Sequence, residues 1–241
     1  MTDSRSLPLP DQSRPALELW AGLECTLNRV GDTQNDELAL TGHYGRDGDL
    51  ALLASLGIRT IRYPVLWERI EANVPDGRAW AWTDERMSQL RALGMTPIVG
   101  LVHHGSGPRH TNLLDPAFPE KLAAFAGQVA RRYPWVTKWT PINEPLTTAR
   151  FSALYGVWYP HERNDALFLR ATLNQIRAIR LAMAAIREAI PDAQLVQTED
   201  LGCTHATPAL QYQADFENAR RWLVFDLLTA RFDADHPLRA Y

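Results

Sequence analysis

The chain has 241 residues, 46% of them hydrophobic, with a formal net charge of −3 and an isoelectric point near 6.2. This composition is typical of a globular protein with enough apolar residues for a large core, and one domain is the default expectation. A weakly acidic chain offers no basic surface for a phosphate backbone, which argues against nucleic acid as a partner. No apolar run is long enough to span a bilayer, so we expect no membrane association.

Residues 1–16 combine charged residues with three prolines and lack the apolar centre of a secretory signal. We therefore predict a disordered tail over residues 1–16, followed by one domain over residues 17–241. Cys25 and Cys203 show no C-x-x-C spacing, and we predict that both are buried free thiols, with a disulfide between them as the alternative. Free thiols and the missing signal favour a cytoplasmic location.

From Leu17 onward, short apolar runs alternate with longer helical patterns. The predicted strands are Leu17–Leu23, Arg59–Tyr63, Thr96–Val102, Trp135–Ile142 and Ala193–Thr198. The predicted helices are Arg46–Leu56, a helix from an N-cap at Thr83 to Gly94, Leu114–Arg132, a helix from an N-cap at Asn164 or Asp165 to about Ala189, and Ala209–Ala230. Strands separated by helices indicate βαβ units and a parallel sheet. Two α/β architectures fit: an open doubly wound sheet, or about the first five units of a (β/α)8 TIM barrel.

Polar side chains follow each predicted strand. In chain order they are Glu24 and Asn28, Arg62, His103 and His104, Asn143 and Glu144, and Glu199 and Asp200. A doubly wound sheet would concentrate such residues at one switch point and would carry a glycine-rich phosphate turn after its first strand. The sequence Ala21-Gly22-Leu23-Glu24 provides no such turn, which disfavours a nucleotide-binding protein. A ring of polar groups at one mouth favours the incomplete barrel.

Each of these residues also has a purely structural interpretation. Arg62 alone is best explained as an ion-pair partner, and a histidine such as His103 is commonly a hydrogen-bonded core residue. Consecutive residues of an extended chain point to opposite faces, so His103 and His104 are expected to diverge, and we predict no metal site. Only the set of residues is specific.

Several motifs resemble those of glycoside hydrolase family 1, the retaining β-glycosidases built on a (β/α)8 barrel. The stretch from Trp139 to Pro145 resembles the Asn-Glu-Pro acid/base signature on the fourth strand of that family. The stretch from Ile61 to Trp67 resembles its second-strand arginine motif, and Leu101-Val-His103 its third-strand sugar-binding histidine. Asn174 and the pair Arg221-Trp222 also stand where the family pattern has similar residues. The resemblance covers roughly Leu17 to Leu228 and concerns the amino-terminal part of the family barrel.

This resemblance implies hydrolysis of β-glycosides by two carboxyl groups about 5 Å apart, one a proton donor and the other a nucleophile. It assigns Glu144 as the general acid/base. Asn143 and His103 would bind sugar hydroxyls, Arg62 would steady the nucleophile, and Asn28, with Val30, stands where the family grips the sugar. Trp158 and Tyr159 either offer faces to a sugar or fill the core. The resemblance implies a carbohydrate partner and no metal or organic cofactor, and it leaves the oligomeric state open.

The sequence departs from the family pattern in two places. The family nucleophile lies on the seventh strand in a Glu-Asn-Gly context that is absent here, so we expect a truncated piece of a longer enzyme. The alternative is a noncatalytic sugar-binding or scaffold module, perhaps fused to an enzyme that acts on sugar nucleotides. The Trp-Asp that follows the family histidine is replaced by His104-Gly105, which leaves the sugar specificity open. Without a second carboxylate, we predict that Glu144 loses its main upward pKa influence and is largely ionised at neutral pH.

Overall fold

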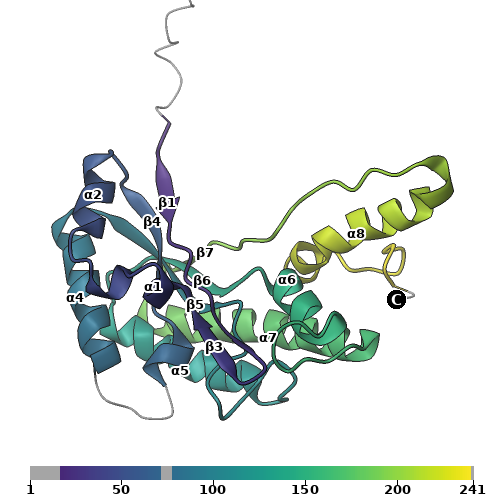
Figure 1. Ribbon diagram of the computed structural model, residues 1–241, viewed down its shortest axis with the longest axis horizontal. Helices are drawn as coiled ribbons and strands as arrows, with labels where there is room; N and C mark the ends of the chain where they lie inside the picture. Colours follow the sequence, from purple (N-terminus) through teal and green to yellow (C-terminus); the bar gives the residue numbers. More distant parts are fainter. Residues whose placement is uncertain (1–16, 72–77, 240–241) are drawn as a thin grey trace, which may run out of the picture.

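The structure is a computed structural model that describes residues 17–71 and 78–239, and the predicted tail over residues 1–16 lies outside the described residues. Five strands form one parallel sheet (Figure 1): β1 Trp20–Gly22, β4 Thr60–Pro64, β5 Thr96–His103, β6 Lys138–Asn143 and β7 Gln194–Leu195. Their spatial order is their chain order, and every neighbouring pair is parallel. A doubly wound sheet reverses its order at the switch point, so this topology confirms the incomplete barrel.

The register of the sheet brings the ends of its strands to one level. Gly22 pairs with Arg62 at the end of β1, and His103 pairs with Asn143 where β5 and β6 both end. Pro145 stops β6 because it has no N–H group and prefers the first turn of a helix, where it stands in α6 Pro145–Ala149. The predicted gathering of polar residues at one edge therefore follows from strand pairing alone.

The longer helices follow the predicted pattern. They are α2 Asp49–Ser55, α4 Arg78–Ala92, α5 Phe118–Arg132, α7 Asp165–Ala189 and α8 Gln211–Leu228. Asn164 is the N-cap of α7, as predicted, and its side chain accepts a hydrogen bond from the Leu167 N–H at 3.1 Å. Helices α5 and α7 lie side by side under the sheet, whereas α8 follows a long connection away from the sheet (Figure 1).

Several predicted boundaries are wrong: α5 begins at Phe118 and not at Leu114, and β6 begins at Lys138 and not at Trp135. Thr83 is no N-cap, because it lies inside α4 and its hydroxyl donates to the Ala79 carbonyl at 2.7 Å; Trp80 and Trp82, which extend the helix upstream, pack against the core. The fifth strand is shorter than Ala193–Thr198. Val196 still donates its N–H to the Trp139 carbonyl, but at Gln197 it is the side chain that donates to a carbonyl of β6, that of Ile142, at 3.1 Å.

Several short elements had no clear sequence signal. Strands β2 Leu27–Val30 and β3 Thr33–Asp36 form an antiparallel hairpin that turns at Gly31, where φ is +57°. The remaining short helices and helical turns are α1 Glu37–Leu40, α3 Trp67–Ile70, η1 His43–Gly45, η2 Arg150–Leu154 and η3 Pro208–Leu210. The hairpin and α3 sit in the loops after the first two sheet strands, where barrel proteins carry their binding residues.

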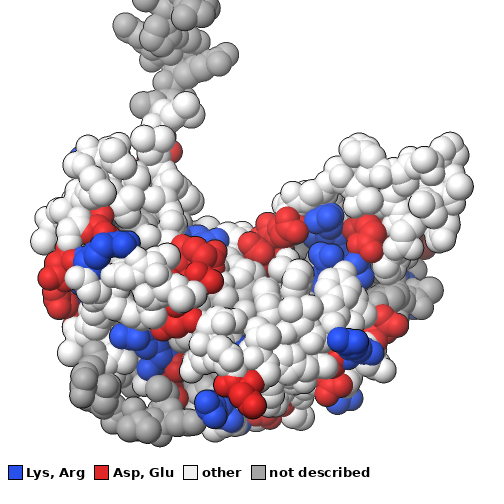
Figure 2. All heavy atoms as spheres, viewed as in Figure 1, with Lys and Arg blue, Asp and Glu red and all other residues white. Residues whose placement is uncertain are grey.

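The core lies between the sheet and the helices that cover it. The sheet contributes Ile61, Val99 and Trp139, and the helices contribute residues such as Leu122 and Ile179, each no more than 1% exposed. Both cysteines are free thiols, as predicted, but only Cys25 is buried; the prediction was wrong for Cys203, which is exposed in the connection before α8. No described helix is long and apolar enough to cross a membrane. Acidic and basic side chains are interspersed over the face seen in Figure 2.

Packing under the sheet predicts a clear difference between two leucines. Leu122 of α5 is fully buried, so Leu122→Ala leaves a cavity and should lower the free energy of unfolding by about 2–5 kcal/mol in urea denaturation. Leu52 of α2 is 63% exposed, and Leu52→Ala should change it by less than about 0.5 kcal/mol. Equal losses for the two variants would contradict this placement of the core.

Candidate active site at the carboxyl ends of the strands

The side chain of Asn143 joins the ends of β5 and β6 to the segment after β7. Its Nδ2 lies 3.2 Å from Nε2 of His103 and 3.2 Å from Nε2 of His104. Its Oδ1 accepts a hydrogen bond from the Thr198 hydroxyl at 3.0 Å. Asn143 is 2% exposed, so these bonds replace water around a buried amide. The strand-end residues predicted from sequence thus meet at one amide.

The two histidines converge, contrary to the prediction that they diverge. Their ring centroids are 4.9 Å apart. His104 is no longer in extended backbone: its φ is +56°, in the left-handed region, which turns its side chain back toward the strand end. Glu144 has the same kind of conformation after β6, with φ of +44°. Non-glycine residues in this region are strained, and such strain is concentrated at functional sites.

Hydrogen bonds fix the protonation of both rings. An amide N–H donates only to an unprotonated ring nitrogen, so Nε2 of each histidine is the acceptor and Nδ1 carries the proton. Nδ1 of His103 lies 3.1 Å from the Cys25 sulfur, and Nδ1 of His104 lies 3.1 Å from the Thr148 hydroxyl. Burial lowers the pKa of His103 to about 3 and the pKa of His104 to about 4. Both rings are therefore neutral hydrogen-bonding groups at physiological pH.

Glu144 lies beside this cluster, with its Oε2 3.8 Å from Nε2 of His104 and its side chain 27% exposed. Burial raises the pKa of Glu144, the Asp200 carboxylate raises it further, and Arg62 opposes the rise. The upward influence thus persists without a second catalytic carboxylate. This corrects the prediction that the influence would be lost, because burial, which sequence inspection underrated, is its main cause.

Glu199 is a further carboxyl group at this site. Its Oε1 accepts a hydrogen bond from the Leu146 N–H at 2.7 Å, and its buried Oε2 has no hydrogen-bond partner among the described residues. Burial raises the pKa of Glu199 to about 8, the Leu146 N–H opposes the rise, and the charge of Glu144 adds to it. Glu199 therefore holds a proton at neutral pH and anchors the start of α6, the helix that follows Glu144.

Arg62, His103 and Asn143 line one recess at the strand ends, together with Cys25. Its volume is about 10 Å³, the space of a single water molecule. Among the described residues, this recess is therefore too small to hold a whole sugar ring. Three of the predicted binding residues therefore lie together at this recess. Glu144 is near them, since the charge of Arg62 lowers its pKa.

Asn28 does not join them. Its Oδ1 accepts a hydrogen bond from Asn35 across the β2–β3 hairpin at 3.1 Å, and it lines a different cavity with Arg29 and Glu68. The hairpin was not predicted from sequence, so the position of Asn28 could not be predicted either.

Other residues of the sequence motifs have separate positions. Trp158 stacks on Phe151 and lies 5.0 Å from His104 between ring centroids, so it borders the site. Tyr159 carries the Arg29 guanidinium on its ring at 3.6 Å. Asn174 donates to the Leu113 carbonyl at 2.8 Å, which fixes the loop before α5. Among residues 17–71 and 78–239, no group of three or more His, Cys, Asp or Glu is placed to hold a metal ion.

An incomplete (β/α)8 barrel with a carboxyl group, an amide and two histidines at its strand ends places this chain among barrel proteins that carry polar groups on the carboxyl-terminal face of the sheet. The sequence profile of the family "Glycosyl hydrolase family 1" matches residues 19–230. The chain therefore belongs to glycosyl hydrolase family 1, as its motifs indicated.

Curated relatives align over part of their length. A 6-phospho-beta-glucosidase of Dickeya chrysanthemi is 25% identical over 181 residues, which are 71% of this chain and 39% of that protein. Beta-glucosidase A of Thermotoga maritima is 25% identical over 200 residues, which are 78% of this chain and 43% of that protein. The chain thus spans less than half the length of these relatives.

Solved structures share the fold. The Thermotoga maritima beta-glucosidase in complex with deoxynojirimycin superposes with a TM-score of 0.65 at 21% identity, over 74% of this chain and 43% of that one. The complex of that enzyme with galacto-hydroximolactam gives a TM-score of 0.70, over 81% of this chain and 46% of the other. At this identity the likeness supports the partial barrel alone.

The hydrogen bonds of Asn143 predict the titration of its two neighbours. Nitrogen-15 NMR should show His103 and His104 neutral, protonated on Nδ1, with no titration between about pH 5 and 8, because their pKa values lie near 3 and 4. A midpoint near 6.5 for either ring would contradict the buried arrangement.

The raised pKa of Glu199 predicts that the free energy of unfolding falls as the pH rises. The folded protein holds its proton up to about pH 8, whereas the unfolded chain releases it near pH 4.5. The free energy of unfolding should therefore fall between these values, by at most about 1.4 kcal/mol for each pKa unit, and level off above. Glu199→Gln should flatten this part of the profile in urea denaturation, whereas Glu188→Gln, an exposed change on α7, should not. A Glu199→Gln profile parallel to that of the unchanged protein would refute the protonated state.

Proposed function

We propose that this chain supplies the acid/base half of a retaining β-glycosidase active site. Glu144 is the general acid that protonates the leaving oxygen and later the general base that activates water. The observation that carries this role is its raised pKa in a partly buried position beside the Asn143 cluster. A carboxyl group in such a place retains a proton at a higher pH than a solvated one.

The other residues would hold the sugar. Asn143 and His103 line the recess, and a sugar hydroxyl would replace the hydrogen bond that now joins their side chains. Arg62 would stabilise the attacking carboxylate, since a guanidinium at the strand end lowers the pKa of nearby acids. Trp158 would offer its ring at the border of the site. The ligand class is a β-glycoside, in keeping with relatives named as beta-glucosidases.

In this proposal, residues 1–241 do not supply the second catalytic carboxylate. No Glu-Asn-Gly sequence occurs in residues 1–241. Glu199 is a poor substitute, because a carboxyl group with a pKa of about 8 is protonated and non-nucleophilic at neutral pH. The same observation supports a second candidate, a noncatalytic sugar-binding or scaffold module, in which the strand-end cluster binds sugar without cleaving it.

Hydrolysis of an aryl β-glucoside, with the product anomer read by NMR, tests the proposal. A gene product that contains a second carboxylate should hydrolyse the substrate with retention. Glu144→Gln should slow cleavage of a glycoside with a poor leaving group by about 10²–10⁴-fold, because proton donation is lost. Residues 1–241 alone should bind deoxynojirimycin at Asn143 without turnover. Inversion of the anomer, or full activity in Glu144→Gln, would refute the assigned role, and binding with no hydrolysis by the whole gene product would favour the noncatalytic module.

A further inference from the structure

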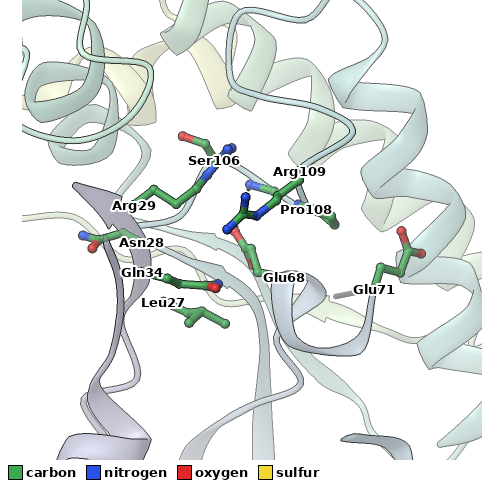
Figure 3. A pocket seen from close by; sticks show the side chains of 10 residues that line it. Leu27, Asn28, Arg29, Gln34, Glu68, Glu71, Ser106, Pro108 and Arg109 are labelled. Atoms are coloured by element: carbon green, nitrogen blue, oxygen red, sulfur yellow. Dashed lines mark hydrogen bonds between the residues drawn. The ribbon is translucent and has the colours of Figure 1, made fainter. Parts of the chain in front are cut away.

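A second cavity lies apart from the recess at the strand ends, and the two share no lining residue. Its volume is about 160 Å³, on the order of ten times the space that one water molecule needs. Residues of the β2–β3 hairpin, the helical turn α3 and the loop after β5 line it: Leu27, Asn28, Arg29, Gln34, Glu68, Glu71, Ser106, Gly107, Pro108 and Arg109 (Figure 3). No role proposed above uses this cavity.

Glu68 is a buried acid aimed at this space. It is 7% exposed, its Oε1 accepts a hydrogen bond from the Gly107 N–H at 2.8 Å, and its buried Oε2 has no partner among the described residues. An unpartnered buried carboxyl oxygen is costly, and such groups commonly mark a ligand site. Gly105 makes room for it, because a Cβ at that position would lie 2.0 Å from the Glu68 Oε1. Burial raises the pKa of Glu68 to about 7, so this carboxyl group can either donate or accept a hydrogen bond near neutral pH.

Arg29 approaches from the opposite side of the cavity. Its guanidinium lies on the Tyr159 ring at 3.6 Å, and its backbone carbonyl accepts from the Tyr159 N–H at 2.8 Å. The Ser106 hydroxyl donates to the Tyr159 carbonyl at 2.7 Å. This bond joins the loop after β5, which forms the third wall of the cavity, to the loop that carries Tyr159. The buried Nη2 of Arg29 has no partner among residues 17–71 and 78–239. A donor and an acceptor without partners are therefore held in place around one space, and Figure 3 shows them converging.

The lining defines the chemistry of the ligand. Arginines and glutamates both line the cavity, so a strongly anionic ligand and a strongly cationic ligand would each meet like charges on its walls. The amides of Asn28 and Gln34 add both donors and acceptors, and Leu27 and Pro108 add apolar surface. Many hydrogen-bonding groups of both kinds beside a small apolar wall suit a ring that carries hydroxyl groups on its edge and C–H groups on its face.

We propose that this cavity binds one neutral monosaccharide unit, held between Arg29 and Glu68, at a site separate from Glu144. The unpartnered Nη2 of Arg29 and Oε2 of Glu68 have almost no accessible surface, so both side chains turn toward the cavity on binding to hydrogen-bond the sugar hydroxyls. Asn28 belongs to this second site and not to the strand-end cluster. The proposal does not depend on cleavage at Glu144, because the site requires no reaction.

Chemical-shift mapping of the full 241-residue chain tests it. Glucose, galactose and mannose are titrated separately, with inorganic phosphate and alanine as charged probes. At least one neutral sugar should shift the backbone amide of Gly107 with a Kd of about 1 mM, the range expected for a ligand of this size, and the charged probes should not. No shift at Gly107 with any of the sugars, or a stronger response to phosphate or alanine, would overturn the proposal.

Variants locate the site. Arg29→Met and Glu68→Gln should each weaken the Gly107 response at least tenfold. Arg91→Met is the matched control. It removes an exposed arginine of α4, whose guanidinium carbon lies 5.8 Å from the Trp135 ring centroid, and it should leave the Gly107 response unchanged. Glu68→Gln keeps the size of the side chain, so it remains informative if Arg29→Met unfolds. An undiminished response in Glu68→Gln would refute the assignment. If the function proposed for Glu144 fails, deoxynojirimycin will not shift the NMR signal of the Asn143 side-chain amide. That outcome leaves the sugar response of Gly107 unaffected, so the two failures can be told apart.

Discussion

Parallel strands that pair in chain order must end at the same edge of the sheet, and the chemistry proposed for this protein depends on that constraint. His103 pairs directly with Asn143 in the register of β5 and β6, so the residues that follow each strand are neighbours in space. The Asn143 amide then links both histidines and the segment after β7. Breaking this register would move every strand-end side chain by one position and turn it to the other face of the sheet.

Burial converts this arrangement into a set of groups with altered protonation. The same loss of water that makes His103 and His104 neutral raises the pKa values of Glu144 and Glu199. The pKa values of the histidines thus fall and those of the glutamates rise for one physical reason, because burial disfavours the charged form of each group. A site whose histidine rings are uncharged and whose Glu199 keeps its proton is suited to neutral, hydroxyl-rich ligands, because these groups form hydrogen bonds without adding charge.

The sequence predicted the parts of the fold that depend on periodicity and strand ends. The five sheet strands, the five longer helices and the meeting of Arg62, His103 and Asn143 follow from alternating apolar runs and from the rule that parallel strands end together. The β2–β3 hairpin was missed because Leu27–Asp36 alternates poorly and carries Asn, Asp and Gln, which strands disfavour or tolerate weakly. Asn28 was consequently assigned to the wrong neighbours. The left-handed backbone at His104 and Glu144 was also hidden, since neither residue type signals it.

The central claim is that the strand-end cluster around Asn143 is a sugar-binding surface. A crystal structure of the protein with deoxynojirimycin tests this claim most directly. The account predicts the ligand ring within hydrogen-bonding distance of His103 and Asn143, with Glu144 beside the position of the anomeric carbon. A ligand bound elsewhere on the molecule, with the bonds between Asn143 and the histidines undisturbed and uncontacted, would contradict it.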